Sequence, residues 1–447
     1  MKFERTKHSL PEFRRVFASI WLILAQGAFT PFYSQPSPSN FDRDRGHAML
    51  EMVKNDLKNN YYDPTYHGMD IDARFKTADE KIKQAQSLGQ IFGIIGQVLA
   101  ELEDSHTFFL PPGRTSRPEY GWQMQLIGDK CYVTAVKPGS NADTQKLTEG
   151  DEILFIDGRV PQRRNIWKIK YLYHVLRPQA GMHIVVAKPD GKQQQLDVMA
   201  KVQEEKRSID LAGSDVFDLI RHSENQNRLH RQRHVDFGED LFVWKMPGFD
   251  LPKERVDDLV DKFRKKKGLI LDLRGNYGGY EETLLWLISN LFDHDVKIGE
   301  LKRRKETKPL LAKTRGDHAF AGKLIVLIDS ESSSAAELFA REVQLEKRGT
   351  VIGDVSAGAV MRARTFGHEL GVDIVAFYAV SLTDADIIMS DGKSLEHVGV
   401  IPDEIRLPLA GDLAAKRDPV LAYAASLLGV RISPEKAGEL FPIEWQK

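Results

Sequence analysis

The pattern of apolar and polar positions divides the chain into stretches that predict different kinds of structure. Between Phe41 and Leu110, apolar residues recur at helical spacing in GHAMLEMVKNDLKNNYY and again in LGQIFGIIGQVLAELED. From residue 119 to about 205, KCYVTAV and EILFIDGRV read as strands, and HIVVAKPDGKQQQLDVMAKV reads as a hairpin that turns at Pro189-Asp190-Gly191. The pattern therefore predicts a helical domain followed by a β-rich domain, with one helix at NIWKIKYLYHVL.

Between Asp240 and Leu409, apolar β-branched runs alternate with amphipathic helices. Strands that are apolar on both faces must lie between two other layers. We therefore expect an α/β core whose strand-end loops are available for chemistry. The expected strands are LFVWKM, GLILDLRG, KLIVLID, TVIGD and VDIVAFYAV, and the expected helices are ERVDDLVDKFRK, YEETLLWLISNLF, SAAELFAREVQL and, in the tail, DPVLAYAASLLG.

The N-terminal segment has the features of a secretory signal peptide. Five basic residues precede the apolar run VFASIWLILAQGAF, and the Pro/Ser-rich stretch PFYSQPSPSN follows it. The run is too short to span a bilayer comfortably, and an uncleaved anchor is the alternative. We expect a mature protein that begins around Gln35 and works in the periplasm or outside the cell, with membrane contact only if the segment is retained. The linker RLHRQRH before the core is expected to be solvated.

Composition excludes several classes of function. The 63 Lys and Arg residues nearly cancel the 64 Asp and Glu residues, so no global field attracts nucleic acid or an anionic bilayer. The single cysteine, Cys131, excludes an intrachain disulfide, a thiolate zinc cluster and an iron-sulfur site. No metal-ligand spacing and no dinucleotide-binding glycine pattern occurs, and we expect neither a metal nor a cofactor. The histidines checked for such spacing are His67, His222, His230 and His234.

Two strand ends carry candidate chemistry. KLIVLID runs into a serine cluster, and a helix begins at Ser334, where free amides and the helix dipole would stabilise an oxyanion. The alternative is a plain N-cap, because Ser334 and Glu337 have capping-box spacing. LILDLRGNYGG ends in the pair Gly278-Gly279, which lets main-chain amides face a site or merely forms a turn. Asp272 and Arg274 are expected to be a buried pair that positions this turn.

The β-rich stretch resembles a PDZ domain of the type carried by bacterial proteases. The resemblance rests on the strand order, the run VKPGSNADTQKLTEGDEILFIDG and the helix after it. It implies that Tyr120, Gly121 and Trp122 lie where such domains bind a peptide C-terminus by strand addition. The loop lacks the usual Gly-Leu-Gly-Phe form.

Together, the PDZ-like stretch, LRGNYGG, SSSAAE and GVIPDEI resemble the C-terminal processing (tail-specific) and tricorn-like serine peptidase family. The resemblance implies a crotonase- or Clp-protease-like α/β core, endoproteolysis of protein or peptide substrates, and Ser334 as the nucleophile. The oxyanion would be held by the amides of Ala335 and of Gly278 or Gly279. The expected divisions are 1–34 (signal peptide), 35–112 (helical domain), 117–205 (PDZ-like domain), 206–411 (peptidase core) and 412–447 (helical tail).

The better-known branch of this family pairs its serine with a lysine 25 residues later, but here that position is Ala359. The tricorn-like branch takes its base from a histidine before the PDZ domain, which implies His106 in the motif Asp104-Ser105-His106. Imidazole has an ordinary pKa near 6.5 and can accept a serine proton at neutral pH. The resemblance further implies that Glu396 orients the histidine, and that Ser105 holds the glutamate or a water. His397 is expected on a strand, facing away.

Two readings compete with the enzyme. Relatives of this fold that have lost catalysis would make the chain a binder of peptides or apolar ligands, and a third reading is a scaffold whose PDZ-like domain captures C-termini. The presence of Ser334, His106 and Glu396 at three matching positions favours a peptidase, because a pure binder has no need of all three. The sequence leaves the substrate and the oligomeric state open.

Overall fold

The computed structural model describes residues 38–113, 116–204, 231–371 and 376–445 of the 447-residue chain. The expected signal peptide, 1–34, lies outside these residues. No helix within the described ranges has the length and apolarity needed to cross a bilayer.

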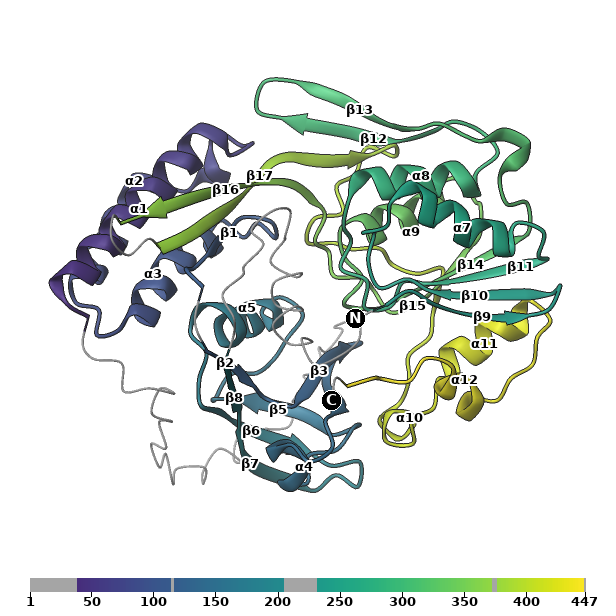
Figure 1. The fold of residues 1–447 in the computed structure, drawn as a ribbon, viewed down its shortest axis with the longest axis horizontal. Coiled ribbons are helices and arrows are strands. Elements are labelled where there is room, and N and C mark those ends of the chain that lie inside the picture. Colours follow the sequence, from purple (N-terminus) through teal and green to yellow (C-terminus); the bar gives the residue numbers. More distant parts are fainter. Residues whose placement is uncertain (1–37, 114–115, 205–230, 372–375, 446–447) are drawn as a thin grey trace, which may run out of the picture.

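The first described region consists of three helices that pack on a sheet. They are α1 (Asn40–Asn60), α2 (Ile71–Lys83) and α3 (Leu88–Ala100). Their N-cap residues are Ser39, Asp70 and Ser87, and each N-cap side chain accepts a hydrogen bond from a backbone amide in the first turn of its helix. Their apolar faces share one core with part of an antiparallel sheet, and Figure 1 shows the purple helices beside the green strands of that sheet. The helices that the spacing predicts in this region are confirmed.

That antiparallel sheet has the order β1-β17-β12-β13, with β16 also paired to β17. Residues 376–380, the described part of the run VDIVAFYAV that was expected in the α/β core, lie instead in β17 of this antiparallel sheet, so that expectation is wrong for these residues. The helices on one side bury these residues. That burial accounts for the apolar character of the run, which the sequence analysis took as the sign of a strand in a parallel sheet. The strands are β1 (Phe108–Leu110), β12 (Val296–Arg303), β13 (Thr307–Ala312), β16 (Met361–Leu370) and β17 (Ala376–Met389).

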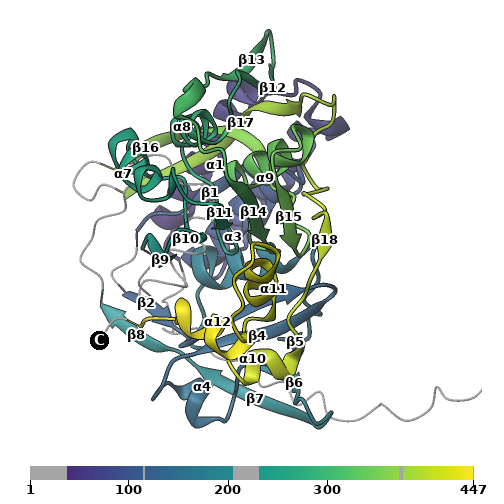
Figure 2. The same cartoon turned by 90° about the vertical axis from the view of Figure 1, so that its right-hand side faces the viewer.

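A β-rich unit lies at the lower end of the molecule in Figure 2. Its five strands pair in sequence order and antiparallel, and the hairpin predicted at Pro189-Asp190-Gly191 joins the last two. Cys131 is buried in the unit's core. The elements are β3 (Trp122–Ile127), β4 (Lys130–Val136), α4 (Asn141–Thr144), β5 (Glu152–Ile156), α5 (Ile166–Tyr171), η2 (Leu172–Leu176), β6 (Gly181–Ala187) and β7 (Gln193–Met199), with the paired strands β2 (Ser116–Glu119) and β8 (Lys201–Glu204) beside them.

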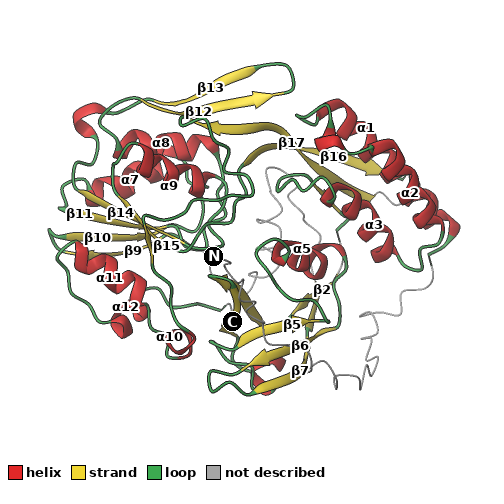
Figure 3. Cartoon of the chain, turned by 180° about the vertical axis from the view of Figure 1, so that it is seen from behind, coloured by secondary structure: helices red, strands yellow, loops and turns green. Residues whose placement is uncertain are grey.

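The third sheet has six strands, and helices cover both of its faces. Its order is β18-β15-β14-β11-β10-β9, parallel except for β9. Side chains alternate between the layers, since Phe242 and Trp244 face one core and Leu241 and Val243 face the other. Figure 3 shows α7, α8 and α9 over one face and α11 and α12 over the other, which explains why these strands are apolar throughout.

Apart from VDIVAFYAV, the strands and helices expected in this layered region are present, but the sequence did not predict its first strand, β18, α10 or α12. Arg233, expected in a solvated linker, begins β9 and donates to the carbonyl oxygen of Pro442 in the C-terminal tail at 2.7 Å, so that expectation is wrong there. The elements are β9 (Arg233–Phe237), β10 (Leu241–Lys245), α7 (Lys253–Phe263), β11 (Gly268–Asp272), α8 (Glu281–Leu291), β14 (Lys323–Ile328), α9 (Ala335–Leu345), β15 (Thr350–Gly353), β18 (Glu404–Ile405), α10 (Ala410–Ala414), α11 (Pro419–Leu427) and α12 (Pro434–Leu440), with short 3-10 turns η1 (Tyr66–Gly68) and η3 (Gly316–His318) elsewhere.

Candidate active site

Ser334 lies at the sharp turn between β14 and α9. Its backbone has φ +53° and ψ −119°, a combination that residues with side chains rarely adopt. The turn is held on both sides, because the Ser334 amide donates to the carbonyl oxygen of Ala359 at 2.9 Å and to the carboxylate of Glu337 at 3.0 Å. The Glu337 amide in turn donates to the carbonyl oxygen of Ser334 at 2.9 Å. The strained conformation is therefore fixed by main-chain contacts and by the Glu337 carboxylate.

Glu337 does more than cap the helix. Its buried carboxylate also accepts hydrogen bonds from the amides of Gly358 (2.8 Å) and Ala359 (3.0 Å) and from the Ser356 hydroxyl (2.5 Å). Burial raises the pKa of Glu337 to about 7, although the hydrogen bonds oppose that shift. Glu337 thus ties the start of α9 to the segment 356–359, a role that capping-box spacing alone does not reveal.

The glycine pair after β11 packs directly on the Ser334 turn. Gly278 has φ +92°, and a Cβ placed on it would lie 2.6 Å from the Cβ of Ser334 and 3.0 Å from the amide nitrogen of Ala335. Glycine is required at this position both by the positive φ and by the close approach of Ser334. The Gly278 amide donates to Oδ1 of the buried Asn276 at 2.8 Å, so an oxyanion at that amide would have to replace this bond. Gly279, at φ +134°, is exposed.

Asn276 is a site residue that the sequence analysis missed. Its Nδ2 donates to the carbonyl oxygen of Met246 at 2.8 Å, and its own carbonyl oxygen accepts from the amide of Ser333 at 2.9 Å. It therefore links the ends of β10 and β11 to the residue before Ser334. Its position two residues before Gly278 is the only signal in the sequence, and short polar residues in glycine turns commonly make such local bonds.

Glu396, Ser105 and His106 form one hydrogen-bonded chain. The amide and the hydroxyl of Ser105 both donate to the Glu396 carboxylate, each at 2.9 Å. The Ser105 hydroxyl oxygen lies 2.7 Å from Nδ1 of His106. His106 and Ser105 are buried, and they follow α3, some 290 residues from Glu396 in sequence. The contact between Glu396 and the histidine therefore runs through the Ser105 hydroxyl.

The directions of these bonds determine the histidine tautomer. A serine hydroxyl has one proton, and when Glu396 is ionised Ser105 donates that proton to its carboxylate. Nδ1 of His106 must therefore carry a proton and donate it to the Ser105 oxygen. In the neutral ring this leaves Nε2 as the basic nitrogen, the form required of a general base that accepts a proton at Nε2.

Two consecutive residues connect this chain to the serine turn. The amide of Val360 donates to the Glu396 carboxylate at 2.8 Å, and the carbonyl oxygen of Ala359 accepts from the Ser334 amide at 2.9 Å. Ala359, which stands where the better-known branch has its lysine, is buried beside Ser334. The segment 356–360 thus brings Ser334 and Glu396 into one neighbourhood.

Glu396 is held in an environment that disfavours its charge. Burial and, next, the negative charge of Asp104 raise the pKa of Glu396 to about 8, against the effect of three hydrogen bonds. His397 lies in a turn at φ +62°, not on a strand as expected, and its Nε2 is 3.7 Å from the Glu396 carboxylate. The strand-alternation argument that turned His397 away from the site is therefore wrong, although its side chain is largely exposed.

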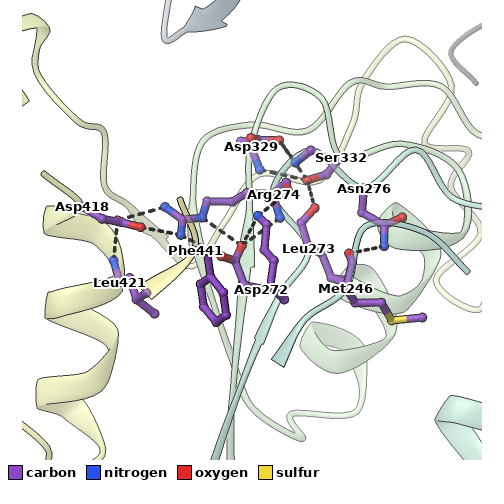
Figure 4. A network of polar contacts seen from close by, with 12 residues as sticks. Met246, Asp272, Leu273, Arg274, Asn276, Asp329, Ser332, Asp418, Leu421 and Phe441 are labelled. Carbon is purple, nitrogen blue, oxygen red and sulfur yellow. Dashed lines mark hydrogen bonds and ion pairs between the residues drawn. The ribbon is translucent and has the colours of Figure 1, made fainter. Parts of the chain in front are cut away.

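Asp272 and Arg274 form the buried pair that the sequence predicts, and the pair belongs to a larger network (Figure 4). The Arg274 guanidinium donates to Asp272 at 2.8 and 2.9 Å and to Asp418, the N-cap of α11, at 2.7 and 3.0 Å. Lys245 adds a bond to Asp272 at 3.1 Å. The arginine and lysine charges hold the pKa of Asp272 far below its usual range despite burial. The network fixes the end of β11 before the glycine turn.

The residues proposed for peptide capture lie at the start of β3. Tyr120 and Trp122 are buried in the core of the β-rich unit, and Gly121 has φ +73°. The carbonyl oxygen of Gly121 accepts from the amide of Lys137 at 2.8 Å. The side chains of Tyr120 and Trp122 therefore belong to the core of the unit.

Among the described residues, no group of three or more His, Cys, Asp or Glu side chains could hold a metal ion. His222 and His230 lie outside the described residues, and His67 bonds to the hydroxyl of Tyr61.

Comparison with known proteins identifies the layered region. Residues 242–406 match the profile of Peptidase family S41. This region is therefore similar to that family. The S41 region contains Ser334, the glycine turn and Glu396, whereas Ser105 and His106 precede it. The resemblance inferred from the motifs is thus confirmed at the level of the family.

Two curated relatives are the tail-specific protease of Haemophilus influenzae and the carboxy-terminal processing protease CtpA of Bacillus subtilis. The first is 23% identical over 74% of this chain and 47% of its own length, and the second is 28% identical over 35% of this chain and 34% of its own length. The chain therefore spans less than half the length of either protease.

Among solved structures, mature CPAF is similar at a TM-score of 0.62, with 14% identity over 84% of this chain and 94% of that one. At this identity the likeness concerns the fold alone, which is a mixed α/β fold with several sheets.

Proposed function

We propose that the chain is a serine endopeptidase that hydrolyses protein or peptide substrates through Ser334, His106 and Glu396, with Ser105 between the last two. The observation that carries this proposal is the hydrogen-bonded chain Glu396–Ser105–His106, joined through Val360 and Ala359 to the strained Ser334 turn. Both named relatives are proteases, which supports the same activity.

In the proposed mechanism, Nε2 of His106 removes the hydroxyl proton of Ser334 while the serine oxygen attacks a peptide carbonyl carbon. The imidazolium that forms continues to donate its Nδ1 proton to the Ser105 oxygen, and the Ser105 hydroxyl continues to donate its own proton to the Glu396 carboxylate. The ionised carboxylate stabilises the positive ring through this bond. His106 then returns the proton to the leaving amine, and water hydrolyses the acyl-enzyme by the reverse proton path.

The oxyanion of the tetrahedral intermediate would be held by main-chain amides at the start of α9 and in the glycine turn. The amide of Ala335, the first residue of α9, has the position and dipole for this role. Within the described part of the chain, the amides of Ala335 and Gly279 make no backbone hydrogen bond, whereas Gly278 donates to Asn276. We therefore favour Gly279 as the second donor, with Gly278 available if the Asn276 bond opens.

The β-rich unit is proposed to be a PDZ-like module that captures a substrate C-terminus or gates the site. Its position supports a coupling to the nucleophile, because the loop 329–331 before Ser334 touches two of its elements. The Gln125 amide on β3 donates to Asp329 at 2.7 Å, and Lys170 on α5 donates to Glu331 at 2.9 Å. A C-terminal peptide that adds to β3 should therefore alter hydrolysis, measured as a change in the rate of casein cleavage.

The finer domain divisions and the cellular location belong to the same proposal. We assign the layered core to the crotonase- or Clp-protease-like class, with divisions at 35–112, 117–205, 206–411 and 412–447. Export through the segment 1–34 would place the enzyme in the periplasm or medium, which cell fractionation tests.

The test of the proposed function is covalent labelling with a fluorophosphonate together with hydrolysis of casein. We expect Ser334 to be labelled, and Ser334→Ala and His106→Ala each to abolish labelling and hydrolysis while the thermal midpoint stays nearly unchanged. A folded wild-type chain that is never labelled would point to the non-catalytic binder. Normal activity in either variant would refute the assigned residue.

A further inference from the structure

Asp104 is a buried carboxylate directly before the Ser105-His106 pair, and it takes no part in the proton transfers of the proposed mechanism. Its Oδ1 accepts a hydrogen bond from the amide of His106 at 2.9 Å. This bond closes a tight turn of the kind that aspartate side chains form with the amide two residues on. The carboxylate therefore fixes the backbone from which both Ser105 and His106 project.

Two hydroxyl groups from distant elements hold Asp104 in place. Thr383, in the interior of β17, donates to Oδ1 at 2.5 Å, and the fully buried Tyr61, at the end of α1, donates to Oδ2 at 2.9 Å. Burial and the Asp104 charge raise the pKa of Tyr61, so it remains a neutral donor. Nε2 of His67 lies 2.8 Å from the Tyr61 oxygen and supplies the second bond to that hydroxyl. The helical region and the antiparallel sheet thus meet at this carboxylate.

Asp104 also acts on Glu396 through space. Its charge is the second cause, after burial, of the raised pKa of Glu396. The pKa of the half-buried Tyr62 is raised by burial first and then by nearby carboxylates that include Asp104 and Glu396. Several titratable or charged groups face Glu396 from the surrounding elements, namely Asp104, His106, Tyr62, His397 at 3.7 Å, and Asp386. Asp386 is linked to the Glu396 amide through the Ser394 hydroxyl.

We infer that Asp104 is a positioning residue of the proposed catalytic chain: held by Tyr61 and Thr383, it fixes the turn that carries Ser105 and His106 and places a second negative charge beside Glu396. This inference rests on the proposed function. Asp104 makes no contact with the reacting atoms in this scheme. It sets the geometry of the histidine and the pH at which Glu396 becomes ionised.

The decisive variant is Asp104→Asn, and the readout is the rate of Ser334 labelling by a fluorophosphonate across pH 5 to 10. The amide keeps an oxygen for the His106 amide but removes the charge beside Glu396. We expect the midpoint of the rising limb to move toward acid by roughly half a pH unit or more, and the plateau rate to fall by about tenfold. A purely structural role would lower the plateau without moving the midpoint.

Tyr61→Phe and Thr383→Val keep the charge and remove one donor each. We expect either change to lower the plateau several-fold while the midpoint stays closer to the wild-type value, and Thr383→Ser to restore the rate. Asp56→Asn is the matched control, since Asp56 on α1 bonds to His368 and not to the catalytic chain. It should change neither quantity.

The outcomes separate this inference from the proposed function. A folded wild-type chain that is never labelled overturns both. A wild type labelled at Ser334, together with an Asp104→Asn midpoint equal to that of wild type, overturns this inference alone. If Asp104→Asn does not fold, Thr383→Val decides, because an undiminished plateau in that folded variant would contradict the positioning role.

Discussion

The two buried polar networks near the glycine turn differ in whether the carboxylate has a cation. Asp272 faces Arg274 and Lys245, and its pKa lies far below the ordinary value. Glu396 is bonded to the amides of Ser105 and Val360 and to the Ser105 hydroxyl, and its pKa rises to about 8. Burial alone therefore does not decide the charge of a carboxyl group; the nearest charged partner does.

The difference separates a structural role from a chemical one. A carboxylate fixed by two cations is ionised at every ordinary pH and can only hold elements together, here β10, β11 and α11. A carboxyl group whose pKa lies near neutrality changes its charge within the working range and can respond to a proton on the histidine. The same contrast predicts opposite effects on stability and activity.

The largest expected effect on stability comes from the cation-rich network. Arg274→Met leaves Asp418 without its partner and Asp272 with Lys245 alone, so the free energy of unfolding should fall by about 3 to 5 kcal/mol in urea denaturation. Arg255→Met is the control, because the exposed Arg255–Asp258 pair contributes at most about 1 kcal/mol. Equal losses in the two variants would show that burial of the network is irrelevant.

Glu396→Gln should reverse the pattern by reducing activity while sparing stability. We expect labelling and hydrolysis to fall by about 10² to 10⁴, because the imidazolium loses its counter-charge. The wild-type labelling rate should rise with pH near the pKa of Glu396, about 8, because Glu396 ionises there. The variant should lack this pH-dependent rise.

The stability of the same variant tests the sign of the pKa shift. The folded pKa of Glu396, about 8, lies above the ordinary 4.5, so its stabilising contribution is complete below 4.5 and is lost as pH rises toward 8. Glu396→Gln should therefore gain thermal stability relative to wild type at pH 9 but not at pH 4. His397→Gln, a change of the exposed neighbour, should leave rate and stability nearly unaltered.

A smaller effect should come from the glycine turn that lies between the networks. Gly278→Ala adds a methyl group 2.6 Å from the Ser334 Cβ and strains a positive φ, so we expect a loss of about 1 to 3 kcal/mol and a markedly slower labelling rate. Gly275→Ala shares the positive φ but meets no atom within 4 Å. It should lose stability alone, by about 1 to 2 kcal/mol, and similar labelling rates in both variants would contradict the steric argument.

The smallest effect should come from Ser333→Ala. The Ser333 hydroxyl is fully buried and has no hydrogen-bond partner in the described part of the chain. Its removal should change the free energy of unfolding by less than about 1 kcal/mol, toward greater stability, and leave labelling intact. Loss of labelling would transfer the nucleophile from Ser334 to its neighbour.

The sequence predicted elements well wherever one local pattern was sufficient. The helices of the N-terminal region, the hairpin at Pro189-Asp190-Gly191 and the strand–turn–helix around Ser334 follow from spacing and turn residues. It failed for VDIVAFYAV, because an apolar run does not reveal which of two sheets buries it. It failed for Arg233 because the partner strand and the C-terminal tail are distant in sequence.

By itself the sequence determined which residue types stand at the strand ends, that a lysine is missing 25 residues after Ser334, and that a histidine and a glutamate stand at matching motif positions. Only the tertiary structure decided that the Glu396 contact to His106 runs through Ser105, that Gly278 is engaged by Asn276, and that Asp104 supports the histidine turn. The physical reason is that hydrogen bonds and charge effects depend on distances of a few ångströms between segments hundreds of residues apart, which local patterns do not encode.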